Sequence, residues 1–259
     1  MKKNKTGEKI SNVNLEDGPI FYRSKLAYIF ASQFSNGKVL ELGTGTGYGI
    51  DYLAKNADLL LTIDKDTVNY RKITGDLKNV FFLKLKVPDL YGIPSESFDL
   101  IVCLQFIEHI EDDIKLMQEI FRVLKKNGKC IVSTPNKNMT ISRNPYHYRE
   151  YNPTELRNLV SKFSPKEIKI LGVNGNEKVN TYYQLNKYSV KKIERFDIFL
   201  FRKWLPSFVL KLPFEILNRY NRLKLYKKNS LIVNKINVND FTISDDLDHA
   251  FDLMLEFTK

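Results

Sequence analysis

The sequence predicts an α/β fold, a doubly wound and mostly parallel sheet with helices on both faces. Short apolar runs alternate with segments of helical periodicity as far as Val173, and this alternation is typical of such folds. The runs are apolar throughout, as in parallel strands that are buried on both sides. A glycine-rich turn directly follows the first run. The expected strands are Lys38–Leu42, Leu59–Asp64, Val80–Leu85, Phe98–Leu104, Lys129–Thr134, Glu167–Val173 and Ala250–Thr258.

Three segments between these runs have the apolar spacing of amphipathic helices. Phe21–Phe34 precedes the first strand, and Pro153–Phe163 follows the fifth. Glu111–Lys126 begins with three acidic residues and ends with two lysines, which suits the dipole of a helix. Asn127 and Gly128 are expected to stop it.

Composition indicates a folded chain with an anionic partner. The 259 residues include 43% hydrophobic ones, enough to build a core, and the formal net charge of +11 favours nucleic acid, phospholipid or phosphorylated ligands. Cys103 and Cys130 lie within apolar runs and outside any metal or redox spacing. No run resembles a signal peptide or approaches the roughly 20 apolar residues of a membrane span. These features predict a cytoplasmic protein.

Much of the positive charge belongs to one segment, Lys191–Lys228, which holds eleven basic and three acidic residues (11 − 3 = +8). The segment is also rich in aromatic residues, and Pro206 and Pro213 are expected to break it into short helices. We therefore expect a flexible N-terminus at residues 1–20, a core at 21–174 plus 244–259, and a helical insertion at 175–243.

Three roles are open for the basic segment 191–228. It could cover the substrate, with its lysines and arginines solvated. It could also dock on an anionic membrane, since short basic helices with an apolar face lie at that interface. Nucleic-acid binding fits less well, because the aromatic residues are grouped like a hydrophobic face.

The glycine-rich turn in VLELGTGTGYG indicates a ligand site. Gly43, Gly45 and Gly47 let the main chain bend tightly and approach a ligand closely. The G-x-G-x-x-G spacing of a dinucleotide loop fails in every register. Asp64 ends the second strand, where a carboxylate can accept both hydroxyls of a ribose. The ligand should therefore contain a ribose and need not contain a pyrophosphate.

The order and spacing of five segments resemble the class I S-adenosylmethionine-dependent methyltransferases, from about Tyr22 to Val173. The segments are VLELGTGTGYG, LLTID, IPSESFDLIVCLQFIEHI, EIFRVLKKNGKCIVSTPN and NPYHYREYNPTEL. The resemblance implies a seven-stranded sheet whose last strand, antiparallel, lies beside the fifth. The cofactor it implies is S-adenosylmethionine.

The resemblance also implies which residues bind the cofactor. The glycine loop would pass under its methionine part, with Glu41 anchoring the loop and Asp64 holding the ribose. Family members commonly bind the adenine amino group through an acidic residue after the third strand, but this chain has Val87 there, so main-chain groups would take that role. The residues assigned to cofactor binding are Glu41, Gly43, Thr44, Gly45, Gly47, Asp64, Val87 and Gln105.

Two histidines are candidates for catalysis. Methyl transfer from a sulfonium chiefly needs an aligned acceptor and excluded water, and His109 or His147 could take a proton from a hydroxyl acceptor. In some relatives an E-x-x-E-H stretch at this point binds a divalent metal, but Gln105 replaces the first glutamate, so no metal is predicted. Alternatively, Glu108 and His109 cap the ends of a strand and a helix.

The segment Tyr146–Glu150 follows the fifth strand and suits a polar, sugar-like acceptor near the site. A loop packed only by its aromatic side chains is the alternative. The sequence thus predicts an S-adenosylmethionine-dependent methyltransferase, with O-methylation of a small-molecule, glycan-like or lipid-linked acceptor. The alternatives are a non-catalytic nucleotide- or nucleic-acid-binding module and a NAD-dependent oxidoreductase, which the failed glycine spacing disfavours.

Overall fold

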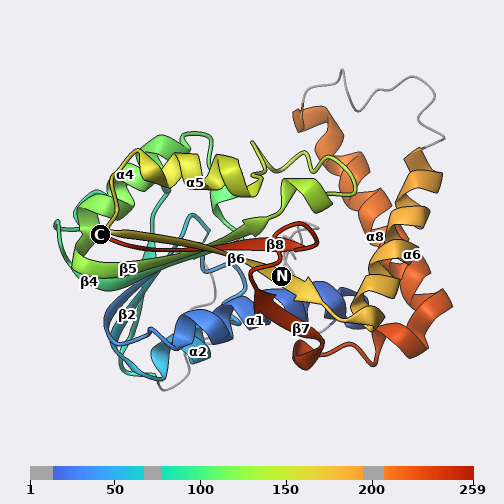
Figure 1. The fold of residues 1–259 in the computed structure, drawn as a ribbon, viewed down its shortest axis with the longest axis horizontal. Coiled ribbons are helices and arrows are strands. Elements are labelled where there is room, and N and C mark those ends of the chain that lie inside the picture. Colours follow the sequence, from blue (N-terminus) through green and yellow to red (C-terminus); the bar gives the residue numbers. More distant parts are fainter. Residues whose placement is uncertain (1–13, 67–76, 195–206) are drawn as a thin grey trace.

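The protein folds into three layers around one mixed sheet, as the computed structural model shows (Figure 1). The structure describes residues 14–66, 77–194 and 207–259. The strands are β1 (Gly37–Leu42), β2 (Ala57–Asp64), β3 (Val80–Lys84), β4 (Phe98–Leu104), β5 (Leu124–Pro135), β6 (Glu167–Gly175), β7 (Phe241–Ser244) and β8 (Asp252–Thr258). The helices are α1 (Gly18–Ser32), α2 (Ile50–Ala54), α4 (Asp113–Val123), α5 (Pro153–Ser161), α6 (Glu177–Glu194) and α8 (Ser207–Val233).

The strand order is β3-β2-β1-β4-β5-β8-β6-β7. The first five strands are parallel, and β8 is antiparallel to both β5 and β6. The α/β fold and the position of the last strand beside the fifth are therefore confirmed. The sheet has one strand more than expected, because β6 continues to Gly175 and its end pairs with Phe241–Ser244.

Each face of the sheet buries its own hydrophobic cluster. Side chains of α4 and α5 pack on one face, and those of α1 and α2 pack on the other. Cys103 and Cys130 are fully buried in the first cluster, as expected, and burial raises the pKa of both thiols. Packing from both sides explains why the strands read as continuous apolar runs.

The predicted end of the helix Glu111–Lys126 was wrong. α4 ends at Val123, and Leu124 is already extended, with φ −75° and ψ 132°. Leu124 pairs with Phe98, so β5 begins before the two lysines that suited a helix terminus. Lys125 instead pairs with Asp99 across the two strands at 2.7 Å. Strand pairing thus outweighs the local preference for helix.

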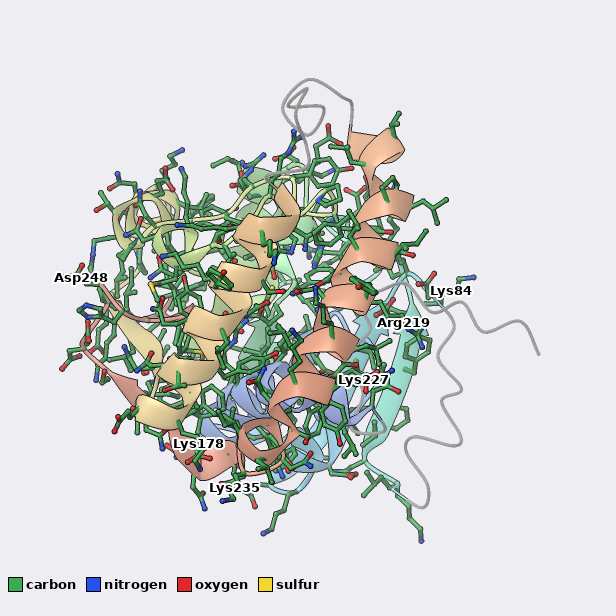
Figure 2. The ribbon with its side chains drawn as sticks, turned by 90° about the vertical axis from the view of Figure 1, so that its right-hand side faces the viewer. Lys84, Lys178, Arg219, Lys227, Lys235 and Asp248 are labelled. Atoms are coloured by element: carbon green, nitrogen blue, oxygen red, sulfur yellow. The ribbon has the colours of Figure 1, made fainter. Side chains whose placement is uncertain are left out.

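The insertion contains two long helices that stand side by side in Figure 1 and Figure 2. Pro213 lies inside α8 and does not end it, which corrects that prediction, while Pro206 lies outside the described residues. Asn221, 3% exposed, joins the two helices: its Nδ2 donates to Asn186 and its Oδ1 accepts from Ser189. Packing against α6 therefore supports α8 through the position where proline removes a backbone donor.

The predicted domain boundaries fall close to element ends without matching them. The boundary after residue 20 lies inside α1, and Asp17, just before that helix, is buried and paired with Arg222 of α8 at 2.8 Å. The boundaries near 174 and 244 lie within β6 and at the end of β7. The division into core and insertion stays a prediction.

A buried carboxylate joins α1, β1 and β2. Glu41 of β1 accepts hydrogen bonds from the hydroxyl of Tyr28, at 2.8 Å, and of Thr62, at 2.5 Å. Its side chain is almost inaccessible, and burial raises its pKa to about 7, although both hydrogen bonds act in the opposite direction. Thr62 also contacts the hydroxyl of Thr44 at 2.5 Å. Glu41 therefore fixes the segment that follows β1.

Replacing Glu41 by glutamine is expected to make the free energy of unfolding less dependent on pH. The pKa of Glu41 is about 7 in the folded protein against 4.5 for an ordinary glutamate, so between these values the folded state binds more protons than the unfolded chain. The stability that Glu41 contributes is therefore present below pH 4.5 and is lost as the pH rises through about 7, by about 3 kcal/mol. Glu41→Gln keeps the shape and cannot titrate.

Urea unfolding at several pH values, followed by circular dichroism, measures this difference. As the pH rises from 4.5 to about 7, the free energy of unfolding of Glu41→Gln should increase relative to that of the wild type. Parallel curves for the two proteins would show that Glu41 is ionised throughout.

Candidate cofactor and acceptor site

The glycine loop lies between β1 and α2, at the carboxyl ends of the central strands. Gly43, Gly45 and Gly47 have φ values of 89°, 56° and 80°, a region that glycine adopts without strain. The backbone N–H groups of Gly43 and Thr44 both donate to the carbonyl of Ile63 in β2, at 2.9 and 3.1 Å. The loop is thus tied to the neighbouring strand.

One side of the loop is open. A Cβ on Gly43 would meet the ring of Phe106 at 2.4 Å, whereas a Cβ on Gly45 would meet no heavy atom within 4 Å among the described residues. The Gly45 N–H donates to Asp64 at 2.9 Å, and Asp66 N–H donates to the other oxygen of Asp64 at 3.0 Å. Each carboxylate oxygen keeps a further lone pair. Asp64, the residue predicted to bind the ribose, therefore lies directly beside the open part of the loop.

The other two predicted cofactor residues are placed differently. Val87 follows β3 and is 7% exposed, with its side chain in the core, so only its main chain could meet a ligand. Gln105 directly follows β4 with φ 51°, and its side-chain amide donates to Ser133 of β5 at 3.3 Å. Gln105 thus faces away from β1, and both assignments stay predictions.

His147 lies beside Glu108 and His109 in the structure, although it is far from these two adjacent residues in the sequence. Each offers a ligand atom, and these atoms lie within 4.8 Å of one another. Burial raises the pKa of Glu108 to about 7, and its carboxylate accepts from Thr134 at 3.0 Å. Burial and then His147 lower the pKa of His109 to about 4. Within residues 14–66, 77–194 and 207–259, these three residues are the set that could hold a metal, and the predicted absence of a metal stays a prediction.

His147 is held on both sides of its ring. Nδ1 lies 2.7 Å from the carboxylate of Glu150, and Nε2 lies 2.8 Å from the amide nitrogen of Asn144. Because a carboxylate only accepts, Nδ1 carries the proton, and the lone pair of Nε2 accepts from the amide. Glu150 also accepts from the hydroxyl of Thr140. The ring is therefore oriented with its basic nitrogen defined.

His147 and Glu150 lie on the wall of a cavity of about 250 Å³. Loop residues after β5 form one side of this cavity, and α1, α6 and α8 form the other. Four asparagines and several aromatic side chains dominate the lining: Asn136, Asn144, Asn186, Asn218, Tyr182, Tyr183, Phe214 and Phe251. Asn144 and Glu150 also line a more open groove of about 760 Å³ next to it. His109 is in the lining of neither space.

One ion pair of the site was not predicted from the sequence. Arg23 of α1 lines the cavity and pairs with Asp252 of β8 at 2.8 Å. Asp252 is 2% exposed, and burial raises its pKa while Arg23 lowers it. Asp252, an acidic residue inside the apolar run of the last strand, was the sequence feature that could have indicated the ion pair. Its partner could not be recognised, because α1 and β8 lie at opposite ends of the sequence.

Comparison with known proteins identifies the family. Residues 16–171 match the family described as a methyltransferase domain. A probable S-adenosylmethionine-dependent methyltransferase of Mycolicibacterium smegmatis is 33% identical over 162 residues, which are 60% of this chain and 62% of that protein. The chain thus spans about six tenths of the length of the curated relatives it matches.

Solved structures share the fold at low sequence identity. A methyltransferase of Thermotoga maritima, described as a possible histamine N-methyltransferase, has a TM-score of 0.56 at 16% identity and covers 92% of both chains. The [4+2]-cyclase SpnF has a TM-score of 0.54 at 18% identity, over 91% of this chain and 80% of its own. A cyclase on this fold shows that the fold alone does not define the reaction.

The family match covers more than half of the chain and includes the glycine loop, the acid that ends β2 and both histidines of the candidate site as far as His147. The chain therefore belongs to the class I S-adenosylmethionine-dependent methyltransferases.

Proposed function

We propose that this chain methylates an oxygen atom of a polar, hydroxyl-bearing acceptor of the glycan type. The observation that carries the proposal is the position of His147. Its ring is oriented by Glu150, and both side chains lie on the wall of a polar cavity at the carboxyl end of β5. The glycine loop follows β1, two strands away, which is roughly 10 Å in a sheet.

The residues of the loop fit S-adenosylmethionine. The open side of Gly45 lets a ligand reach the main chain, and Asp64 presents a carboxylate that can accept ribose hydroxyls. When bound, this cofactor supplies a methyl group on a positively charged sulfur atom. The carboxylate of Glu41 is buried and accepts hydrogen bonds from Tyr28 and Thr62, so it positions the loop rather than the ligand.

Within this proposal His147 removes the proton of the acceptor hydroxyl. Nδ1–H donates to Glu150, so the lone pair of Nε2 is the base. The carboxylate of Glu150 also stabilises the imidazolium that forms when Nε2 takes the proton. In the structure Nε2 accepts from Asn144, and an acceptor hydroxyl would take the place of that amide. His109 has a lowered pKa and packs against His147 with ring centroids 4.9 Å apart. It therefore acts by positioning His147.

The lining of the cavity supports a sugar-like acceptor. The amides of Asn136 and Asn144 are engaged within the protein. Those of Asn186 and Asn218 can offer donors to hydroxyl groups, and aromatic rings offer flat apolar faces. The volume of about 250 Å³ is just below the usual range of ligand sites, about 300–1,000 Å³. A single sugar unit, alone or at the end of a larger molecule, would suit this space.

A transfer assay tests the proposed function. The protein is incubated with methyl-labelled S-adenosylmethionine and fractionated extract, and the labelled product is identified. A methyl ether on a polar acceptor supports the proposal. Label on nitrogen or carbon would overturn it, and so would bound cofactor without any labelled product.

Replacing His147 by glutamine is expected to lower kcat by roughly 10²- to 10⁴-fold with little change in KM, because proton transfer is lost while the cavity keeps its shape. Glu150→Gln should lower kcat less and shift its pH profile, because Glu150 acts through His147. The control is His249→Gln, since the side chain of His249 is 80% exposed and lies outside both cavities. Full activity in His147→Gln together with loss in His109→Gln would assign the base to His109.

Replacing Gly45 by alanine is expected to weaken S-adenosylhomocysteine binding at least tenfold, because the methyl group enters the open side of the loop. Gly92→Ala is the matched control. Gly92 also has a positive φ, 79°, and space for a Cβ, so both variants carry a similar strain of about 1 kcal/mol. Calorimetric titration gives the affinities, and thermal unfolding gives the stabilities. Equal affinities in the two variants would remove the loop from the binding site.

A further inference from the structure

The outer face of α8 carries a stripe of exposed apolar side chains. Val209, Leu212, Ile216, Tyr220 and Leu223 follow helical spacing and are 36% to 66% exposed. From the first to the last they extend about 21 Å along the helix. We call these five residues the α8 stripe. The opposite face of α8 packs against α6 and lines the acceptor cavity, so α8 has two distinct apolar faces.

The charges of α8 are sorted between these two faces. Glu215 is its one acidic residue, and it accepts a hydrogen bond from the hydroxyl of Tyr146. Arg222 is likewise engaged with Asp17. Lys211 lies over the ring of Tyr146. In the described part of the chain, the other basic residues of α8 have no acidic partner: Arg219, Lys224, Lys227 and Lys228. Figure 2 shows Arg219 and Lys227 beside the helix on this side. The outer surface is thus apolar along its middle and positive around it.

We propose that the α8 stripe and its basic border dock this protein on an anionic phospholipid surface. An apolar helix face with lysine and arginine beside it lies at the boundary between headgroups and acyl chains. Each basic residue near an anionic membrane contributes attraction that falls off within a Debye length. No described helix has the length and hydropathy to cross a bilayer, so the contact is peripheral.

Other occupants fit this surface less well. A second copy of the chain would bring two positive borders together, which is repulsive. Nucleic acid would match the charge, but single strands bind by stacking on aromatic rings, and four of the five stripe residues are aliphatic. A lipid surface satisfies both the charge and the apolar area.

Vesicle flotation tests the proposal with the full chain. The protein should float with vesicles of phosphatidylglycerol and phosphatidylcholine and bind vesicles of phosphatidylcholine alone at least tenfold more weakly. Raising the salt from about 0.1 M to about 1 M shortens the Debye length from about 10 Å to about 3 Å and should release much of the bound protein. No binding to anionic vesicles at low salt would overturn the proposal.

Two sets of variants separate the apolar and the electrostatic parts. Leu212→Ser with Ile216→Ser should weaken vesicle binding at least tenfold, because two exposed side chains no longer enter the lipid. Arg219→Gln, Lys224→Gln and Lys227→Gln together should weaken it about a hundredfold, at about fivefold for each charge. Each variant is checked for an unchanged thermal transition.

Matched controls place the effect on α8. Lys55→Gln, Lys126→Gln and Lys162→Gln remove the same net charge from exposed sites elsewhere, and Tyr91→Ser removes a side chain that is 75% exposed. These controls should bind like the wild type. Equal losses in controls and α8 variants would reduce the interaction to net charge and overturn the proposal.

Two further readouts exclude the other occupants. Tight binding to a single-stranded oligonucleotide that competes with vesicles, or a dimer in lipid-free solution that Leu212→Ser dissociates, would also overturn it. Neither flotation nor these readouts need turnover. A failure here therefore leaves the proposed methyl transfer untouched.

Discussion

The buried carboxylate of Glu41 is the constraint on which the candidate site depends. It lies at the end of β1, where the chain leaves the sheet, and accepts hydrogen bonds from α1 and from β2. Three glycines leave the loop little side-chain packing of its own, so its shape has to be imposed from outside. Glu41 does so through its hydrogen bonds with Tyr28 and Thr62, and the hydroxyl of Thr62 is hydrogen-bonded to that of Thr44 in the loop. A ligand that rests on this loop therefore meets a surface formed before binding.

The last strand has a comparable role for the acceptor side. Because β8 runs antiparallel between β5 and β6, its first residue, Asp252, lies at the same edge of the sheet as the carboxyl end of β5. There it pairs with Arg23 of α1 at 2.8 Å. The insertion of one strand thus joins an N-terminal helix to the middle of the site.

Local sequence predicted much of the fold and the position of the glycine loop and of Asp64 at the carboxyl ends of the strands. The continuous apolar runs, the three glycines and the acid that ends β2 are features of short segments, and each was found where it was expected. The end of α4 was missed, because Leu124 is decided by pairing with Phe98 and not by its helical neighbours. The passage of α8 through Pro213 was missed for a similar reason, since it depends on packing against α6. The proximity of His147 to His109 needs the loop after β5 to fold back, as the bridge between Asn136 and Tyr151 records, and no local pattern encodes it.

The distribution of buried polar groups explains why this edge of the sheet is suited to chemistry. Elsewhere the strands bury aliphatic side chains on both faces, and a carboxylate there would have no donor within reach. At the carboxyl ends Glu41, Glu108 and Asp252 are all nearly inaccessible, and hydroxyls or a guanidinium supply their partners. Hydroxyl donors leave the charge only partly compensated, and burial accordingly raises the pKa of Glu41 and Glu108 to about 7. Burying these titratable groups beside the loop and the cavity therefore lowers the stability of the fold. The apolar cluster on each face of the sheet offsets this cost.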